Sequence, residues 1–229
     1  MTIINLEKKI ISNLSRFELS KEQTNILKKE FKKSNILILG AAGSIGKAFS
    51  LKLKQFNINK IVFLDKDENS LADLARHVVL KYKKKIKKIY ICSDLTQHKM
   101  IENIVKKHKI THFLNFAALK HVRSEEELLS IQYMFKTNCS IFSSKTIFRS
   151  NKLKKIFFIS TDKAAYPSSI MGCSKRLMEN FLYEIKKKYN KKFISSARFA
   201  NVSFSNGSIL KNIYEKTLNS EVFGIPLNI

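Results

Sequence analysis

The chain has 229 residues, a hydrophobic content of 44% and a formal net charge of +25. This length suffices for one α/β domain with a sizeable core, and no apolar run approaches the roughly 18 to 20 residues of a membrane helix. Residues 1–13 carry lysines after a short apolar start and no small-residue cleavage site, so we expect no signal peptide and a cytoplasmic protein.

The positive charge is typical of a general lysine bias. Only six of the 43 basic residues are Arg, although Arg dominates specific contacts with bases. Lysines occur on most predicted helices, with runs at 81–88 and 186–192. We therefore predict no nucleic-acid partner and expect the positive field to attract anionic substrates such as nucleotide sugars.

Cysteine and histidine spacing gives no sign of a metal site. Cys92, Cys139 and Cys173 are far apart and form no C-x-x-C pair, so a disulfide framework or zinc site is not expected. The five histidines do not have a ligand spacing on one element. The cysteines are best interpreted as small buried hydrophobic residues.

Residues 1–33 are predicted to form a helical extension of two short amphipathic helices, the second starting at Ser20 with Gln23 in a capping-box position. Strands and helices alternate after Lys33. The predicted strands are 35–39, 60–65, 86–92, 112–116, 155–160 and 193–199. The first predicted helix follows the glycine-rich turn and runs through about residue 56. The other predicted helices are 69–81, 96–108, 125–149 and 170–189, of which 125–149 is long and perhaps broken. This order predicts a doubly wound parallel sheet, the NAD(P)-binding Rossmann fold, over 34–229.

A glycine-rich turn joins the first strand to its helix. Gly40, Gly43 and Gly46, with Ser44 and Ile45 between them, lie where a dinucleotide fold needs a tight turn and a close approach to pyrophosphate. The helix N-terminus would then direct N–H groups at the phosphates. A glycine-rich turn can also be purely structural.

Acidic residues end the next two strands. Asp65 lies 19 residues after Gly46, where a carboxylate accepts both ribose hydroxyls of NAD and repels the 2′-phosphate of NADP. Lys66 weakens that preference, because a cation there could accommodate the phosphate. Asp94 and Leu95 follow the third strand at a typical place for contact with adenine, although Asp94 could instead be a residue of a helix N-cap. We expect NAD or NADP, with NAD slightly favoured.

The stretch 160–176 carries the chemistry. Asp162 and Lys163 place an acid beside an amine, and Met171 and Lys175 lie four residues apart, on one face of a helix. Short-chain dehydrogenase-like enzymes have Tyr-x-x-x-Lys at this spacing. Here the Tyr position is Met171, whose thioether cannot carry a proton at neutral pH.

These motifs together resemble the extended short-chain dehydrogenases of the CapD-like polysaccharide-biosynthesis type, the UDP-N-acetylglucosamine 4,6-dehydratases. The matching segments are Gly40-Ala-Ala-Gly-Ser-Ile-Gly46, Ala117-Ala-Leu-Lys-His-Val122, Ser160-Thr-Asp-Lys-Ala164, Met171-Gly-Cys-Ser-Lys-Arg176 and Arg198-Phe-Ala-Asn-Val202. Segments 120–124 and 200–207 look like the branch tied to legionaminic-acid-type sugars. Met171 also occurs at this position in some members of the family.

The resemblance implies a redox-neutral lyase reaction. The sugar C4 hydroxyl is oxidised to a ketone by NAD(P)+, the C5 proton is removed, water leaves from C6, and the hydride returns to C6. By resemblance, Asp162 would be the acid at the C6 hydroxyl and Lys163 the base at C5. Thr161 would touch the substrate near C4 and Lys175 would bind the nicotinamide ribose. The remaining implied contacts are Ala117, Ala118 and Lys120 to the cofactor, Asn138 as a helix residue supporting the substrate site, and Asn201 to the UDP part.

The chemistry constrains these roles. Asp162 needs a raised pKa to act as an acid, and Lys163 a lowered pKa to act as a base. The alternative interpretation of the pair is a surface ion pair at a turn. The Tyr166 hydroxyl is another candidate base, although Tyr166 reads as part of a loop.

Family members continue for about another hundred residues, which build a lobe that closes over the sugar. From this we expect the chain to be C-terminally truncated, with the substrate lobe largely absent. The alternatives to a dehydratase are a catalytically silent NAD(P)-binding module and a UDP-sugar 4-epimerase, which Met171 disfavours because epimerases rely on the Tyr. The expected partners are a UDP-sugar and further copies of the chain in a homo-oligomer, with no membrane.

Overall fold

The computed structural model describes residues 18–82, 85–119 and 125–222. The chain divides into two compact units. One comprises residues 28–200, and the other combines residues 1–27 with residues 201–229. The predicted boundary at residue 33 remains a prediction. In the second unit, α9 (Ile209–Leu218) is capped by the hydroxyl of Ser208, which accepts the Lys211 N–H.

The larger unit is built on one six-stranded parallel sheet. Its strands are β1 (Asn35–Leu39), β2 (Lys60–Asp65), β3 (Lys87–Cys92), β4 (His112–Asn115), β5 (Lys155–Thr161) and β6 (Phe193–Phe199). Their order is β3-β2-β1-β4-β5-β6, and every neighbouring pair is parallel. The order reverses between β1 and β4, which is the switch point where doubly wound folds bind ligands at the carboxyl ends of the strands.

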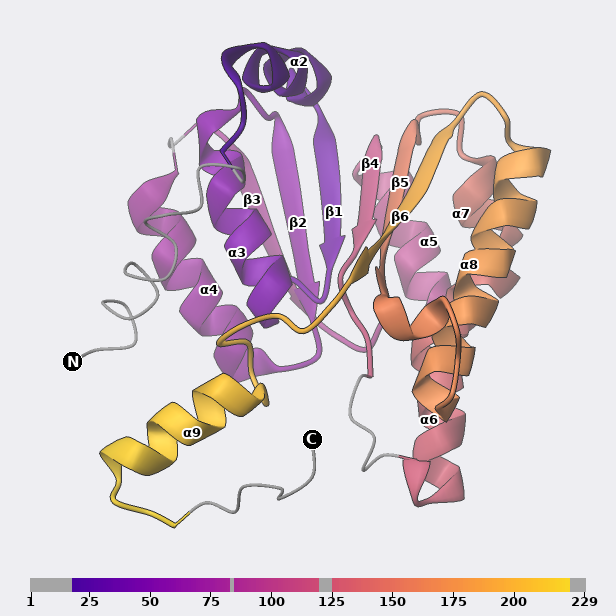
Figure 1. Cartoon of the computed structure of the whole chain (residues 1–229). Helices are drawn as coiled ribbons and strands as arrows, with labels where there is room; N and C mark the ends of the chain where they lie inside the picture. The colour runs from indigo at the N-terminus through magenta and orange to yellow at the C-terminus, as the bar shows by residue number, and fades with distance from the viewer. Residues whose placement is uncertain (1–17, 83–84, 120–124, 223–229) are drawn as a thin grey trace. The chain divides into compact units, whose positions relative to one another are not determined.

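Helices cover both faces of the sheet (Figure 1). The helices of this unit are α3 (Ser44–Lys52), α4 (Glu68–Lys81), α5 (His98–Lys107), α6 (Leu128–Cys139), α7 (Lys145–Arg149) and α8 (Ile170–Lys188). α3 and α4 lie on one face and α5 to α8 on the other, as right-handed crossovers require when the strand order reverses. The helix predicted over 125–149 is interrupted by a 3-10 turn, η4 (Ser140–Ser143). The doubly wound Rossmann fold predicted from the sequence is confirmed.

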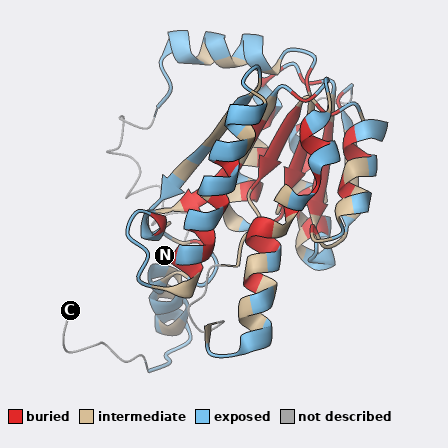
Figure 2. Ribbon diagram, turned by 90° about the vertical axis from the view of Figure 1, so that its right-hand side faces the viewer, coloured by how far each residue is buried: buried red, intermediate tan, exposed pale blue. Residues whose placement is uncertain are grey.

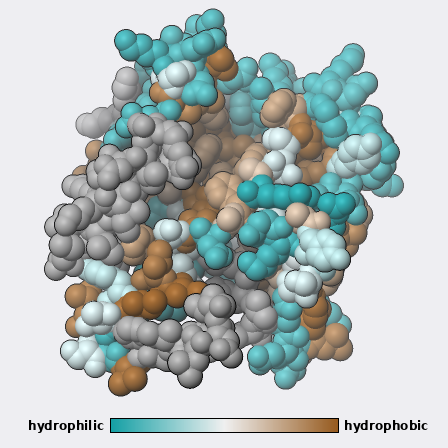
Figure 3. All heavy atoms as spheres, viewed as in Figure 1, coloured by the Kyte–Doolittle hydropathy of each residue, from teal (hydrophilic) through white to brown (hydrophobic). Residues whose placement is uncertain are grey.

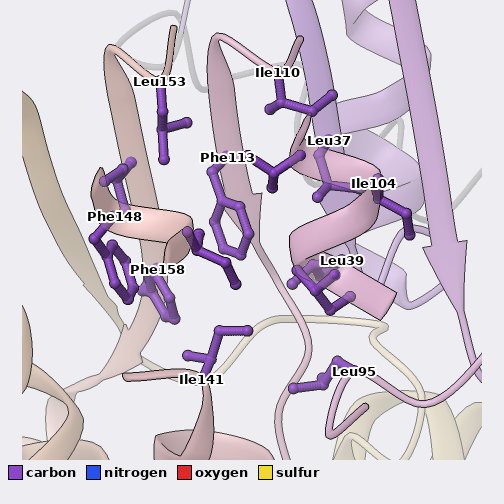
Figure 4. Close-up of a cluster of buried hydrophobic side chains, with 14 of the residues drawn as sticks. Leu37, Leu39, Leu95, Ile104, Ile110, Phe113, Ile141, Phe148, Leu153 and Phe158 are labelled. Carbon is purple, nitrogen blue, oxygen red and sulfur yellow. The ribbon is translucent and has the colours of Figure 1, made fainter. Parts of the chain in front are cut away.

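The core lies between the sheet and the second helix layer. Strand β1 is buried from Ile36 to Leu39, with none of these residues exposed, as expected of a central parallel strand. Figure 4 shows side chains of α5 and α7 meeting those of β1, β4 and β5, with Phe113 and Phe158 in the middle. The burial colours of Figure 2 show the same pattern, buried strands between helices that are exposed on their outer sides. This packed layer fixes the carboxyl ends of the strands.

The last residues of α2 (Lys21–Phe31) pack against the amino end of the sheet. The Phe31 ring lies 4.9 Å from that of Phe56 and 5.5 Å from that of His112, and Glu30 forms an ion pair with Lys155 at 2.6 Å. Burial lowers the pKa of His112 to about 4. The capping box predicted at Ser20 is confirmed, because Ser20 and Gln23 exchange side-chain and backbone hydrogen bonds.

The surface agrees with a charged, lysine-rich composition. On the face drawn in Figure 3, hydrophilic residues cover much of the described surface, with smaller groups of hydrophobic residues between them. Among the described helices, none has both the length and the apolar character needed to cross a membrane.

Candidate active site

The glycine-rich turn adopts a backbone that other residues would disturb. Gly40 has φ +68°, and a Cβ on it would lie 2.5 Å from the Ala117 nitrogen. A Cβ on Gly46 would lie 2.1 Å from the Gly40 oxygen. Both glycines are therefore required by the packing of the turn against α3 and the end of β4.

Gly43 is different, because the nearest atom to a Cβ there is the Gly40 oxygen at 3.5 Å, an ordinary contact. Within the described part of the chain, no contact requires Gly43 to lack a side chain. Gly43 lines a cavity at the N-terminus of α3, where a side chain would keep a ligand from the backbone. This is the fit expected for the pyrophosphate of a dinucleotide, so the residues present suit NAD(P).

Asp65, at the end of β2, is held by two backbone N–H groups. Its Oδ2 accepts from Ala42 at 2.9 Å and its Oδ1 accepts from Asp67 at 3.2 Å. The carboxylate thus ties the glycine-rich turn to the end of β2. Each oxygen keeps a second acceptor site, which suits a ribose hydroxyl.

Asp94, beyond the end of β3, is held by two different donors. Its Oδ1 accepts the Thr96 N–H at 2.8 Å, and its Oδ2 accepts the hydroxyl of Tyr133 from α6. The Lys66 ammonium lies 5.1 Å from the centre of the Tyr133 ring. Burial alone would raise the pKa of Asp94, but the hydrogen bonds from Tyr133 and Thr96 outweigh it and lower that pKa.

These side chains line one cavity of about 180 Å³ at the carboxyl edge of the sheet. Its predicted cofactor residues are Gly40, Gly43, Asp65, Lys66, Asp94, Leu95, Ala117 and Ala118. Its other lining residues, which sequence reasoning missed, are Leu64, Ser93, Phe116, Leu119, Tyr133 and Thr137. The last two lie four residues apart on one face of α6, and tertiary packing, which no local pattern shows, brings that face to the cavity.

Some predicted cofactor residues do not line this cavity. Ser44, Ile45 and Gly46 lie in the first turn of α3, beside it in the chain. Lys175 is buried in α8 and is not among the residues that line the cavity. Lys120 lies outside the described residues.

The turn after β5 brings the predicted acid and base together. The Thr161 hydroxyl donates to Asp162 Oδ1 at 2.8 Å, and the Lys163 N–H donates to the same oxygen at 2.8 Å. The Lys163 ammonium lies 4.0 Å from that oxygen, with 46% of its side chain and 54% of that of Asp162 exposed. In this state the pair has the geometry of an exposed ion pair at a turn.

The raised pKa expected for Asp162 is not found. The hydrogen bond from Thr161 lowers the pKa of Asp162, and the Lys163 N–H and ammonium lower it further. In this state the carboxyl group is therefore held as an anion, and the raised pKa that the acid role requires stays a prediction for the substrate-bound state. Tyr166 is 91% exposed, which removes any contact that would make it a base.

Met171 and Lys175 lie on the first turns of α8 and are buried, at 5% and 4% exposure. The Lys175 Nζ donates to the Ile159 carbonyl of β5 at 3.1 Å. Burial lowers the pKa of Lys175 to about 8. The amine is therefore bonded to β5 two residues before the Thr161–Lys163 turn.

The start of α8 is capped twice. The Ser169 hydroxyl accepts the Gly172 N–H, and the Glu125 carboxylate accepts the N–H groups of Ile170 and Met171 at 3.2 and 3.0 Å. A carboxylate at a helix N-terminus is stabilised by the helix dipole. Glu125 was not expected from the sequence, since its cap lies 45 residues further along the chain.

The predicted substrate residues have different surroundings. Asn138 is 1% exposed and donates from Nδ2 to the Ser174 hydroxyl of α8. A side chain this deeply buried is not placed to contact a substrate directly. Its hydrogen bond instead connects α6 to α8, which agrees with a supporting role. Asn201 is exposed and begins the second unit, and its role stays a prediction. Among the described residues, no cluster of His, Cys, Asp and Glu could hold a metal ion.

Comparison with known proteins identifies the family. Residues 36–225 match the family described as polysaccharide biosynthesis protein. The capsular polysaccharide biosynthesis protein CapD of Staphylococcus aureus is 27% identical over 213 residues, which cover 92% of this chain and 35% of that protein. A UDP-glucose 4-epimerase of Rickettsia bellii is 31% identical over 190 residues, which cover 79% of this chain and 52% of that protein.

The fold has solved counterparts. The UDP-glucose 4-epimerase of Stenotrophomonas maltophila, with bound NAD and formylated UDP-arabinopyranose, matches with a TM-score of 0.59 and 19% identity, over 72% of this chain and 52% of that one. The chain thus spans a third to a half of the length of these relatives. With most of its length matched to one family, the chain belongs to the polysaccharide biosynthesis proteins, as a CapD-like extended short-chain dehydrogenase/reductase.

Proposed function

We propose that this chain supplies the cofactor-binding and acid–base parts of a nucleotide-sugar 4,6-dehydratase that acts on UDP-N-acetylglucosamine. The observation that carries the proposal is the Thr161–Lys163 turn. It presents a hydroxyl, a carboxylate and an ammonium at the carboxyl end of β5. Met171 occupies the position where related dehydrogenases have their Tyr, so the side chains of this turn would carry out the proton transfers.

The proposed cofactor is NAD or NADP, which takes up a hydride from the sugar and returns it. Gly43 leaves room for the pyrophosphate. Asp65 favours the free ribose hydroxyls of NAD, because each of its oxygens retains an acceptor site and its charge repels a phosphate. Lys175 would reach the nicotinamide ribose with an ammonium hydrogen that does not bond Ile159.

The acid role of Asp162 requires a change at Thr161. In this state the Thr161 hydroxyl donates to Asp162 and is the largest cause of its lowered pKa. A sugar hydroxyl that accepted the Thr161 proton would remove this bond. Loss of this bond, together with burial of the carboxyl group under the sugar, would raise the pKa of Asp162 toward a value at which it can protonate the leaving C6 hydroxyl.

The base role of Lys163 requires loss of water around its amine. About half of its side chain is exposed here, so a sugar covering the turn would desolvate the amine and disfavour its charged form. The ammonium of Lys175, which is bonded to Ile159 two residues before Thr161, would add a repelling charge. Both effects favour the neutral amine that can remove the C5 proton.

A UDP-sugar 4-epimerase is the second candidate. The likeness to the Rickettsia bellii epimerase favours it, and Met171 opposes it because the C4 proton would lack its usual carrier. A silent NAD(P)-binding module is the third candidate. The exposed, ionised Asp162 supports it.

One experiment separates these candidates. The purified chain is incubated with UDP-N-acetylglucosamine and NAD+ or NADP+, and the product is weighed by mass spectrometry. A product lighter by one water supports the dehydratase. A new stereoisomer of unchanged mass supports the epimerase, and NADH binding without turnover supports the silent module.

Matched variants assign the residues. We expect Asp162→Asn to abolish water loss while leaving NADH affinity unchanged. Tyr166→Phe, which alters an exposed side chain on the same loop, serves as the control and should retain activity. Full dehydratase activity in Asp162→Asn would show that the acid is another group.

A further inference from the structure

A largely buried carboxylate on α8 has no part in the proposed reaction so far. Glu179 lies four residues after Lys175, so the two side chains share one face of the helix. Only 13% of the Glu179 side chain is exposed. Its carboxylate accepts hydrogen bonds from two strands, because the Ser160 hydroxyl of β5 and the Arg198 guanidinium of β6 both donate to it. Glu179 therefore joins α8 to the carboxyl ends of β5 and β6.

Arg198 orients this carboxylate. Its Nε donates to Glu179 Oε1 at 2.9 Å and its Nη2 donates to Oε2 at 2.7 Å. Such a bidentate pair fixes the relative orientation of the two planar groups. Arg198 also lies opposite Ser160 in the register of the two strands. The three side chains thus form one connected group on one face of the sheet.

Ser160 links the carboxylate to the Thr161–Lys163 turn. Its hydroxyl donates to Glu179 Oε1 at 2.6 Å, and the residue is 4% exposed. Ser160 directly precedes the turn, and Ile159 before it accepts from Lys175 through its backbone carbonyl. The helix therefore holds two successive residues of β5, immediately before the side chains that would transfer protons.

The charge of Glu179 is well defined. Burial alone would raise the pKa of Glu179, but the hydrogen bonds from Arg198 and Ser160 outweigh it and lower that pKa. Burial lowers the pKa of Lys175 to about 8, while Cys139 and Glu179 act in the opposite direction. Burial raises the pKa of the Cys139 thiol to about 11, so near neutral pH Glu179 is the ionised member of these two.

We propose that Glu179 is a positioning residue for the reaction, which holds the Thr161–Lys163 turn in place through Ser160 and is itself oriented by Arg198. Glu179 is not among the residues that line the cavity, so it would act through the residues that it holds. A displacement of about 1 Å at a reacting group can cost about 100-fold in rate. This inference rests on the proposed function, in which the turn carries out the proton transfers.

The first test needs no ligand. Ser160→Ala removes one hydrogen bond and no charge, and leaves Glu179 paired with Arg198. Amide hydrogen exchange is followed by NMR at the N–H groups of Lys163 and Ala165, which both donate to Asp162. We expect their exchange in Ser160→Ala and in Glu179→Gln to be about 10-fold faster than in the wild type, the effect of one lost hydrogen bond.

The second test measures turnover of UDP-N-acetylglucosamine. We expect kcat of Ser160→Ala and Glu179→Gln to fall by about 10- to 100-fold, while KM and NADH affinity change by no more than about twofold. The double variant should lose no more than Glu179→Gln alone, because both substitutions break the same link. Glu184→Gln, the same substitution at an exposed glutamate of α8, is the control and should retain wild-type exchange and kcat.

The outcomes separate this inference from the proposed function. Unchanged exchange in both variants would overturn the inference. Variants that unfold more easily but keep the wild-type kcat would assign Glu179 a structural role only and overturn it as well. Independent, additive losses of kcat in the double variant would show that Glu179 does not act through Ser160. Faster exchange in the variants of a chain whose wild type releases no dehydrated product would retain Glu179 as the anchor of the turn and refute the proposed dehydratase instead.

Discussion

The Lys175 ammonium lies 3.1 Å from the Ile159 carbonyl oxygen, so a lysine of α8 is bonded to the backbone of β5 inside the protein. Only 4% of Lys175 is exposed, and its other near partner is the Met178 sulfur at 3.8 Å. An ammonium has three hydrogens, and this arrangement leaves a donor for a ligand. The position has a cost in stability because a charge is buried without a bonded carboxylate.

The pH dependence of unfolding should reveal this cost. The pKa of Lys175 is about 8 in the folded chain and 10.5 in the reference state, so between these values the unfolded chain binds more protons. Wild-type stability should therefore rise with pH from 8 to 10.5, by up to about 3 kcal/mol relative to Lys175→Met. Denaturant unfolding of both proteins across this range measures the difference.

The matched control for this charge is Lys152→Met, at an exposed lysine before β5. Its unfolding should follow the wild-type pH profile. Below pH 8 we expect Lys175→Met to be at least as stable as the wild type, because an apolar side chain replaces a buried charge. A Lys175→Met protein with the same rise between pH 8 and 10.5 would contradict this account.

Two glycines of the turn should fail in different ways. Gly46→Ala places a Cβ 2.1 Å from the Gly40 oxygen, which forces the backbone apart and should destabilise the fold by about 1–3 kcal/mol. Gly43→Ala meets only ordinary contacts. It should keep wild-type stability and lose affinity for NADH, because its methyl group would occupy the cavity. Thermal unfolding and NADH titration of the two variants measure both effects, and equal stability losses would contradict the distinction.

The sheet could be predicted from the sequence because its strands are continuous apolar runs between helices of regular period. Three strands, 35–39, 60–65 and 193–199, have the predicted bounds. The helix predicted over 125–149 is divided because the Ser140–Ser143 segment forms a 3-10 turn. The hydroxyl groups of Ser140 and Ser143 donate hydrogen bonds to backbone carbonyls there, and a local sequence pattern does not reveal where such bonds form.

Lining residues of the cavity could be predicted where a motif lies at or just beyond the end of a strand, as at Asp65 and Asp94. Its α6 wall could not, because Tyr133 reaches Asp94 through tertiary packing. The same reason applies to Glu125, which caps a helix that starts 45 residues away. The pKa of Asp162 in the free chain could not be predicted from the sequence, because the reaction sets only what the working state requires, whereas here the hydrogen bond from Thr161 lowers that pKa.

His112 should make the larger unit sensitive to acid. The pKa of His112 is about 4 in the folded chain and 6.5 in the reference state. Burial disfavours the charged ring most, and the positive charges of Lys155 and Lys154 lower the pKa further. The negative charge of Glu30 partly compensates. Between these values the unfolded chain binds more protons. The stability that neutral His112 contributes is therefore complete above about pH 6.5 and is lost as the pH falls toward 4.

His112→Phe should remove this part of the acid sensitivity while keeping the ring contact with Phe31. Denaturant unfolding at pH 7 and pH 4.5 measures the change, with His77→Gln, at a half-exposed residue of α4, as the control. If His112→Phe lost as much stability on acidification as the wild type, another group would be responsible.

Thr161 should control the ionisation of Asp162. The Thr161 hydroxyl is the largest cause of the lowered pKa, so Thr161→Val, which removes the hydroxyl and keeps the shape, should raise the pKa of Asp162. The remaining donor, the Lys163 N–H, should keep it from rising far. Carbon-13 NMR titration of the Asp162 carboxyl group, assigned by comparison with Asp162→Asn, measures the shift.

The matched control is Thr96→Val, whose hydroxyl lies near Asp94 and not near Asp162. It should leave the Asp162 titration unchanged. If Thr161→Val also left it unchanged, the hydroxyl could not act as the switch between the ionised and the protonated carboxyl group. The acid step of the proposed dehydratase would then need another source for its raised pKa, such as burial of Asp162 under the sugar itself.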